Sequence, residues 1–153
     1  MRLFRCITFV SLLIGGGCSQ EDASDVFYPF KNHSWSRFNI LSFEIPVKQT
    51  DRPYQVIFYI RHNKDFPFDF LDFNMVMNTP SGEERINEYH LETKDKKGSF
   101  LGKCKGEVCE ISMELKKELY ISTEGNLIIE LENLNPRLET PGLLGVGIRL
   151  VER

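Results

Sequence analysis

The sequence predicts an all-β protein: a single antiparallel β-sandwich of about seven to eight strands behind an N-terminal signal and tether. Two observations favour this fold class. Seven segments after residue 37 carry the apolar alternation, or the β-branched and aromatic content, that is typical of strands. Clusters rich in proline, glycine and asparagine interrupt the chain between several of them, as the turns of an antiparallel sandwich require.

Residues 1–17 have the layout of a secretory signal peptide. Arg2 and Arg5 supply a basic start, residues 6–14 are almost wholly apolar, and three glycines follow before Cys18. The apolar run is too short for a membrane-spanning helix, which needs about 20 residues. A cysteine directly after small residues resembles a bacterial lipobox, in which the cysteine is acylated and begins the mature chain. We therefore expect Cys18 to be a lipid anchor; the alternative is a secreted protein without lipid that is cut nearby.

Residues 18–37 are expected to form a lipidated tether outside the fold. The acids Glu21, Asp22 and Asp25 make a short run that charge keeps solvated and extended. Glu21 and Asp22 also resemble, loosely, the acidic signal for surface display that follows the lipidated cysteine in Bacteroidetes. The sandwich domain is then expected to comprise residues 38–153.

The expected strands follow one another along this domain. Every second residue is apolar through most of 38–47 and 71–79, which predicts strands with one buried face. The segment 54–62 is more continuously apolar, which suits a central strand. Residues 113–120 also fit helical spacing, so a short helix there stays open. The remaining expected strands are 86–93, 108–115, 126–133 and 143–152.

Cys104 and Cys109 remain as an even pair if Cys6 leaves with the signal and Cys18 is acylated. Four residues separate them, and Gly106 permits the tight reversal that a disulfide between them needs. We expect a small hairpin clasp, with free thiols as the alternative. A zinc site is not indicated, because no further Cys or His pair lies nearby.

Charge and motifs favour neither nucleic-acid binding nor catalysis. The formal net charge is −3, and loss of residues 1–17 removes two arginines and no acid, which lowers it to −5. Nucleic-acid partners usually carry a basic face. The chain has no nucleophile-elbow, H-E-x-x-H or phosphate-loop motif. Asp65, Asp69 and Asp72 are candidates for carboxylate chemistry on sugars, but they bracket a turn and a strand. We expect no enzyme, no cofactor and no metal.

The densest chemical feature is the stretch NKDFPFDFLDF, residues 63–73. Its turn supplies a candidate interaction surface formed by Asp65, Phe66, Phe68 and Asp69. Exposed rings there would stack on a sugar while the carboxylates accept hydrogen bonds from its hydroxyls. Packing of Phe66 and Phe68 against the core or the sandwich edge is the favoured interpretation of the same rings.

Motifs that occur in order along most of the mature chain indicate a family. Tyr28 and Trp35 precede FEI at 43–45, and Arg61, DFPF at 65–68 and Leu71 to Phe73 follow, before GSFLGK at 98–103 and GVGIR at 145–149. Together they resemble the pattern of the GldH gliding-motility lipoprotein family of Bacteroidetes. Phenylalanine replaces a larger aromatic residue in DFPF and GSFLGK, and the cysteine pair has no counterpart in that pattern.

The resemblance implies a small outer-membrane lipoprotein that acts by contact, in or near the gliding and associated secretion machinery. Its partners would be the membrane, through the lipid anchor, and other envelope proteins. The alternative function is a surface module that binds glycans through Phe66, Phe68 and the neighbouring aspartates. An exposed aromatic platform would favour that alternative, whereas buried rings would favour an interaction scaffold.

Overall fold

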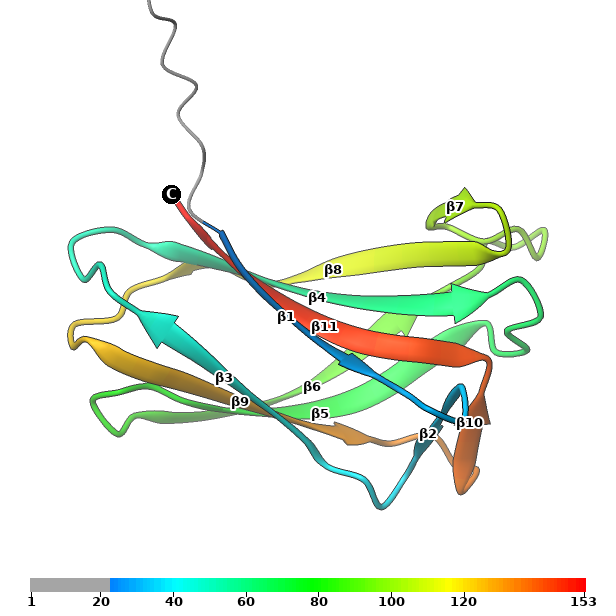
Figure 1. Ribbon diagram of the computed structural model, residues 1–153, viewed down its shortest axis with the longest axis horizontal. Coiled ribbons are helices and arrows are strands. Elements are labelled where there is room, and N and C mark those ends of the chain that lie inside the picture. Colours follow the sequence, from blue (N-terminus) through cyan, green and yellow to red (C-terminus); the bar gives the residue numbers. More distant parts are fainter. Residues whose placement is uncertain (1–22) are drawn as a thin grey trace, which may run out of the picture.

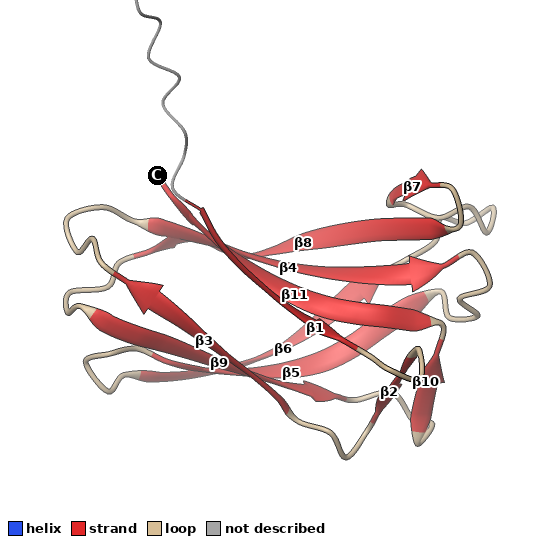
Figure 2. Cartoon of the chain, in the orientation of Figure 1, coloured by secondary structure: helices blue, strands red, loops and turns tan. Residues whose placement is uncertain are grey.

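The computed structural model describes residues 23–153, which form eleven β-strands; none of them belongs to a helix that could cross a membrane (Figures 1 and 2). The expected signal, residues 1–17, and the expected anchor Cys18 lie outside the described residues. The strands are β1 (Ala23–Pro29), β2 (Ser34–Ser36), β3 (Leu41–Val47), β4 (Tyr54–Asn63), β5 (Phe70–Asn78), β6 (Glu84–Glu92), β7 (Lys103–Lys105), β8 (Val108–Leu119), β9 (Gly125–Asn133), β10 (Glu139–Pro141) and β11 (Leu143–Glu152).

The strands form a two-layered sandwich. One layer is a five-stranded sheet with the order β1-β11-β4-β8-β7, and the other is a four-stranded sheet with the order β3-β9-β5-β6. A small sheet of β10 and β2 lies at one end of the two layers (Figure 1). Neighbouring strands are antiparallel throughout. The predicted antiparallel sandwich is confirmed, and β4 is the central strand of its sheet, as its apolar run predicted.

The strand count is higher than the seven to eight expected. The seven expected strands are β3, β4, β5, β6, β8, β9 and β11, and the four additional ones are short or lie at a sheet edge. Strand β8 continues to Leu119, so the short helix left open at 113–120 does not form. Its pairing with β4 contains two register shifts. The buried Leu115 and Leu119 are four positions apart, a spacing that places them on one face of a strand as well as of a helix.

The folded domain begins earlier than the boundary expected at residue 38. Strand β1 pairs with β11 from Ala23 to Pro29, within the segment assigned to the tether. Trp35 of β2 is fully buried, and its indole Nε1 donates a hydrogen bond to the carbonyl of Asn39 at 2.8 Å. The tether expectation for 18–37 is therefore wrong for residues 23–37. Strand β1 escaped notice because it lies at a sheet edge and lacks a clean apolar alternation.

The core lies between the two layers and is lined by alternate residues of the long strands. In β3 the exposure alternates strictly, with Leu41, Phe43, Ile45 and Val47 buried. Across the layers, Phe58 of β4 stacks on Phe73 of β5 with ring centroids 4.2 Å apart. The period-two pattern thus sends one face of each main sheet inward and leaves the opposite face to carry polar groups.

Candidate functional site

The predicted interaction surface at 65–69 does not exist as one exposed patch. Phe66 is only 1% exposed and packs against His62 and Phe68, with ring centroids 5.1 and 5.4 Å away. Phe68 is half-buried against the core, and the Arg137 guanidinium lies 5.6 Å from its ring centroid. The expectation that Phe66 forms part of a ligand surface is wrong, because this ring fills the end of the sandwich. The aromatic platform needed for glycan stacking is therefore missing at this turn.

The two aspartates of that turn point outward and are separately engaged. The backbone N–H of Asp65 donates to the side-chain oxygen of Asn63 at 3.2 Å. The Asp69 carboxylate pairs with Lys94 Nζ at 3.3 Å, and the Asp69 carbonyl accepts from the N–H of Thr93 at 2.8 Å. These three contacts stabilise local structure, and they do not bring the two carboxylates to one ligand.

His62 is fully buried at the same end of the sandwich. Its Nδ1 donates to the Asn63 carbonyl at 2.8 Å, while Nε2 is buried without a partner in the described residues. The rings of Phe66 and Phe100 enclose it. Burial is the main cause that lowers the pKa of His62 below 6.5, because desolvation disfavours the imidazolium. This histidine is a neutral core residue at physiological pH.

Cys104 and Cys109 form the disulfide that their spacing indicated. They are directly opposed in the β7–β8 ladder, and the turn between these strands contains Gly106 in the left-handed region, with φ 62°. The bond closes a hairpin at the edge of the five-stranded sheet. It fixes the short strand β7 against β8.

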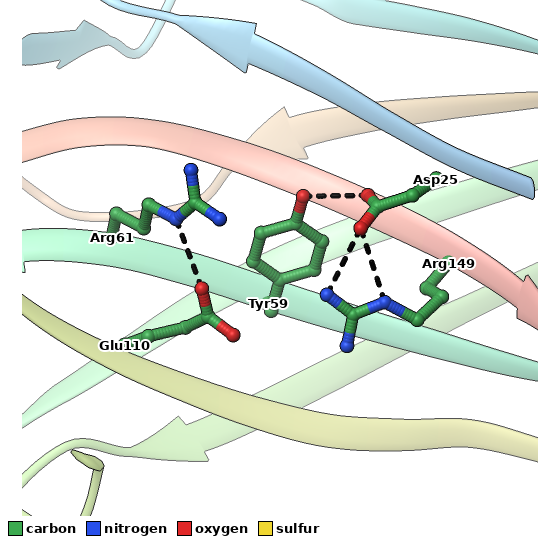
Figure 3. A network of polar contacts seen from close by, with 5 residues as sticks. All are labelled: Asp25, Tyr59, Arg61, Glu110 and Arg149. Atoms are coloured by element: carbon green, nitrogen blue, oxygen red, sulfur yellow. Dashed lines mark hydrogen bonds and ion pairs between the residues drawn. The ribbon is translucent and has the colours of Figure 1, made fainter.

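The richest polar arrangement lies on the outer face of the five-stranded sheet. Strands β1, β11, β4 and β8 each contribute to it (Figure 3). The strand register places Phe27 opposite Gly147, and Gly147 opposite Tyr59. We call the set of Asp25, Phe27, Tyr59, Arg61, Glu110 and Arg149 the outer-face network.

Two glycines make room for the aromatic rings of this network. A Cβ atom on Gly147 would lie 2.2 Å from Tyr59 Cζ, and one on Gly145 would lie 2.2 Å from Phe27 Cζ. The rings therefore lie flat across β11, nearly parallel to each other at an interplanar angle of 10°. Glycine inside a strand commonly marks such a close approach. The GVGIR motif thus has a packing role on this face.

Arginines cover the rings from the solvent side. The Arg149 guanidinium lies 4.8 Å from the Tyr59 ring centroid, and that of Arg61 lies 4.7 Å from the Phe27 centroid. Arginine over an aromatic face is an attractive arrangement worth about 0.5–1 kcal/mol at exposed sites. As a result Tyr59 is only 1% exposed although it is on the outer face.

Asp25 connects strand β1 to Arg149 and Tyr59. Its Oδ2 accepts hydrogen bonds from Nε and Nη2 of Arg149 at 3.1 and 3.0 Å, and its Oδ1 accepts one from the Tyr59 hydroxyl at 2.6 Å (Figure 3). Burial, followed by the hydrogen bond to Asp25 and its charge, raises the pKa of Tyr59 to about 12. The phenol therefore stays protonated and keeps donating at physiological pH.

The second ion pair of the network is Arg61 with Glu110, whose Oε2 lies 2.9 Å from the arginine Nε. Each charged group in the network thus has an opposite charge or a ring beside it. The acids and bases of the network thus pair with one another. The arrangement is a clamp that fastens β1, through Asp25 and Phe27, to β11 and β4.

The sequence identified only part of this network. Arg61 and GVGIR were singled out as motif residues, whereas Asp25 was assigned to the tether and Tyr59 to an apolar run. The available signal was the Gly-x-Gly pattern inside a strand, which indicates that rings or backbone from elsewhere lie across it. Which rings they are depends on pairing between distant segments.

Comparison with known proteins supports the family resemblance. The model of a family described as GldH lipoprotein matches residues 23–150. A curated relative named "Gliding motility lipoprotein GldH", from Flavobacterium johnsoniae, is 22% identical over 100 residues. That match covers 64% of this chain and 63% of the relative, so the chain spans less than two thirds of the relative's length.

Proposed function

Because this chain belongs to the GldH lipoprotein family, we propose that it is a non-catalytic, lipid-anchored protein of the outer membrane that acts by contact with other envelope proteins. The Flavobacterium relative is named for gliding motility, which supports a place in or near that machinery. Cys18 is the proposed acylated residue.

The observation that carries the proposal is the clamp on β1. Only residues 19–22 separate Cys18 from β1, so the Cα atoms of Cys18 and Ala23 are at most about 18 Å apart. A lipid on Cys18 would hold the start of β1 close to the membrane. Any force between the membrane and a bound partner would then pass through β1, the strand that Asp25 and Phe27 fasten to the sheet. A protein that acts by contact would rely on this attachment to stay folded under such a load.

A crosslinking pull-down of the anchored protein from its own envelope tests the contact function. The matched control is a fusion of residues 1–22 to an unrelated β-sandwich, which carries the same export signal and lipid site. We expect the native chain, and not the fusion, to enrich a defined set of envelope proteins. Equal recovery of proteins by both chains would contradict the proposal.

Single-acid variants test the non-catalytic part. Asp65→Ala and Asp69→Ala should change stability by no more than about 0.5 kcal/mol, because both carboxylates are exposed. Each variant should also complement a strain from which the gene is deleted, as the unaltered chain does. Loss of a glycan- or peptide-cleaving activity in either variant, with folding unchanged, would overturn the non-enzymatic assignment.

A further inference from the structure

The four-stranded sheet ends in an open strand, β6. It is nine residues long, contains no proline, and has β5 as its only strand partner within residues 23–153. In Figure 1 it lies at the back of the lower layer, behind β5. A strand edge of this length presents unpaired backbone N–H and C=O groups, which can pair with a strand from another chain.

The other edges of the sandwich are less suited to pairing. Strand β1 ends in Pro29, and β3 contains Pro46, which has no N–H to donate. Strand β7 is only three residues long and is tied by the disulfide. The part of β8 that β7 does not cover contains the register shifts of its pairing with β4, and it carries Lys116 and Lys117. These are the features with which proteins usually block edge pairing.

The ladder between β5 and β6 shows which backbone groups of β6 are open. The N–H of Thr79 donates to the carbonyl of Glu83, and the N–H of Thr93 donates to that of Asp69. In an antiparallel pair, the residues bonded to the partner strand alternate with residues whose N–H and C=O point away. The backbone N–H and C=O groups of the odd-numbered residues of β6 thus point toward β5. The open backbone groups belong to Glu84, Ile86, Glu88, His90 and Glu92.

The side chains of these same residues lie on the outer face of the sheet and are exposed. Three are glutamates, and Ile86 is 60% exposed among them. His90 pairs with Asp72 on β5. Further along the same face, the register places Glu130 and Glu132 of β9 opposite Val76 and Asn74. Within the described strands of this sheet, the outer face holds no lysine or arginine.

We propose that β6 is a docking edge for an extended, basic segment of a partner protein, which adds as a fifth strand to the four-stranded sheet. Backbone hydrogen bonds to the even-numbered residues would supply the pairing, as in other cases of strand addition. Lysine or arginine at alternate positions of the added strand would face the glutamates of β6. A second copy of this chain fits less well, because two β6 strands would place like charges opposite each other.

This inference rests on the proposed contact function and assigns its binding surface, but it is tested separately. The probe is a labelled peptide as long as β6, with alternating lysine and valine. Its binding to the full chain in detergent is measured by fluorescence anisotropy. The comparison peptides carry glutamate in place of lysine, or methyl groups on the backbone nitrogens of alternate residues. We expect the lysine peptide to bind at least about tenfold more tightly than either.

The matched variants are Ile86→Pro and Ile86→Ala. Proline at 86 removes an N–H that points away from β5, so the ladder of the native sheet should remain intact. It should weaken binding of the lysine peptide by at least about tenfold, whereas alanine keeps the N–H and should leave most of the affinity. If the proline variant does not fold, the methylated peptide tests the same hydrogen bonds on the unaltered chain.

Several results would overturn the docking edge. They are absence of binding, equal binding of the lysine and glutamate peptides, equal binding of the methylated peptide, or formation of dimers through β6 seen by light scattering. In the envelope pull-down, a folded Ile86→Pro chain should lose partners that Ile86→Ala retains. If Ile86→Pro retains them all, the docking edge is wrong while the proposed contact function stands.

Discussion

Tyr59 lies on the outer face of its strand and is nevertheless almost fully buried, because Arg149, Arg61 and Phe27 cover it. Its hydroxyl donates to a carboxylate that also binds Arg149. One phenol thereby connects the first strand of the domain to the centre of the five-stranded sheet. At the scale of single residues, this contact has the clearest consequence for stability.

Tyr59→Phe should lower the free energy of unfolding by about 1–3 kcal/mol, because it removes a donor from a charged acceptor. Tyr120→Phe is the control, since Tyr120 is 66% exposed. Urea unfolding at neutral pH measures both variants. Equal stability of the two variants would show that the Tyr59 hydroxyl adds nothing to the clamp.

Tyr59→Phe should also change how the stability of the protein depends on pH, in a direction that follows from the pKa of Tyr59. Tyr59 titrates near 10.0 when unfolded and at about 12 when folded, so between these values the unfolded state loses its proton first. Stability from this group is complete below pH 10 and is lost as the pH rises toward 12. The wild-type chain should therefore lose more stability over that window than Tyr59→Phe. An identical alkaline loss in both chains would contradict this assignment.

At the scale of elements, the small sheet of β2 and β10 joins the N-terminal segment to the core. Trp35 stacks on Phe30 with ring centroids 6.0 Å apart. The buried Asn133 side chain donates to the carbonyl of Trp35 at 3.1 Å and to the Thr140 hydroxyl at 2.9 Å. These contacts connect β2, β9 and β10 at one end of the sandwich.

Trp35→Ala should therefore cost about 3–5 kcal/mol in unfolding free energy, as expected for removal of a fully buried large ring. Leu138→Ala is the control at the same end of the molecule, because Leu138 is 62% exposed. Thermal and urea unfolding compare the two. A tryptophan variant as stable as the control would restore the tether assignment for this segment.

At the scale of the whole molecule, the start of β1 and the end of β11 lie at the same end of the sandwich. Ala23 pairs with Val151, and the N–H of Arg153 donates to the carbonyl of Pro53 (Figure 1). The small sheet of β2 and β10 lies at the opposite end. An anchor at Cys18 would place the first end toward the membrane and leave the small sheet farther from it.

Cys18→Ser should abolish acylation and release the protein from membranes, because the proposed attachment depends on that thiol. The control is Cys104→Ser with Cys109→Ser, which removes the hairpin disulfide and keeps the proposed anchor. Fatty-acid labelling and membrane fractionation measure both chains. Labelling of Cys18→Ser at the level of the unaltered chain would exclude Cys18 as the anchor.

The local pattern of the sequence by itself determined the fold class, the seven long strands and, where the alternation is regular as in β3 and β5, the face that turns inward. Residues such as Leu41, Phe43 and Ile45 alternate with polar neighbours, and that period of two is visible within a few positions. The hairpin disulfide followed in the same way from two nearby cysteines. These features are local, so the sequence alone was enough to predict them.

Only the tertiary structure decided what depends on distant partners. The hydrogen bonds of Asp25 join it to Tyr59 and Arg149, which are 34 and 124 positions away, and no local pattern indicates such pairings. The same holds for Phe66, which is buried at an end of the sandwich where a Cβ atom on the distant Gly142 would lie 3.2 Å from its ring. An edge such as β6 is open because of the order in which strands assemble. A period-two pattern predicts that a strand forms, and long-range packing selects its neighbours.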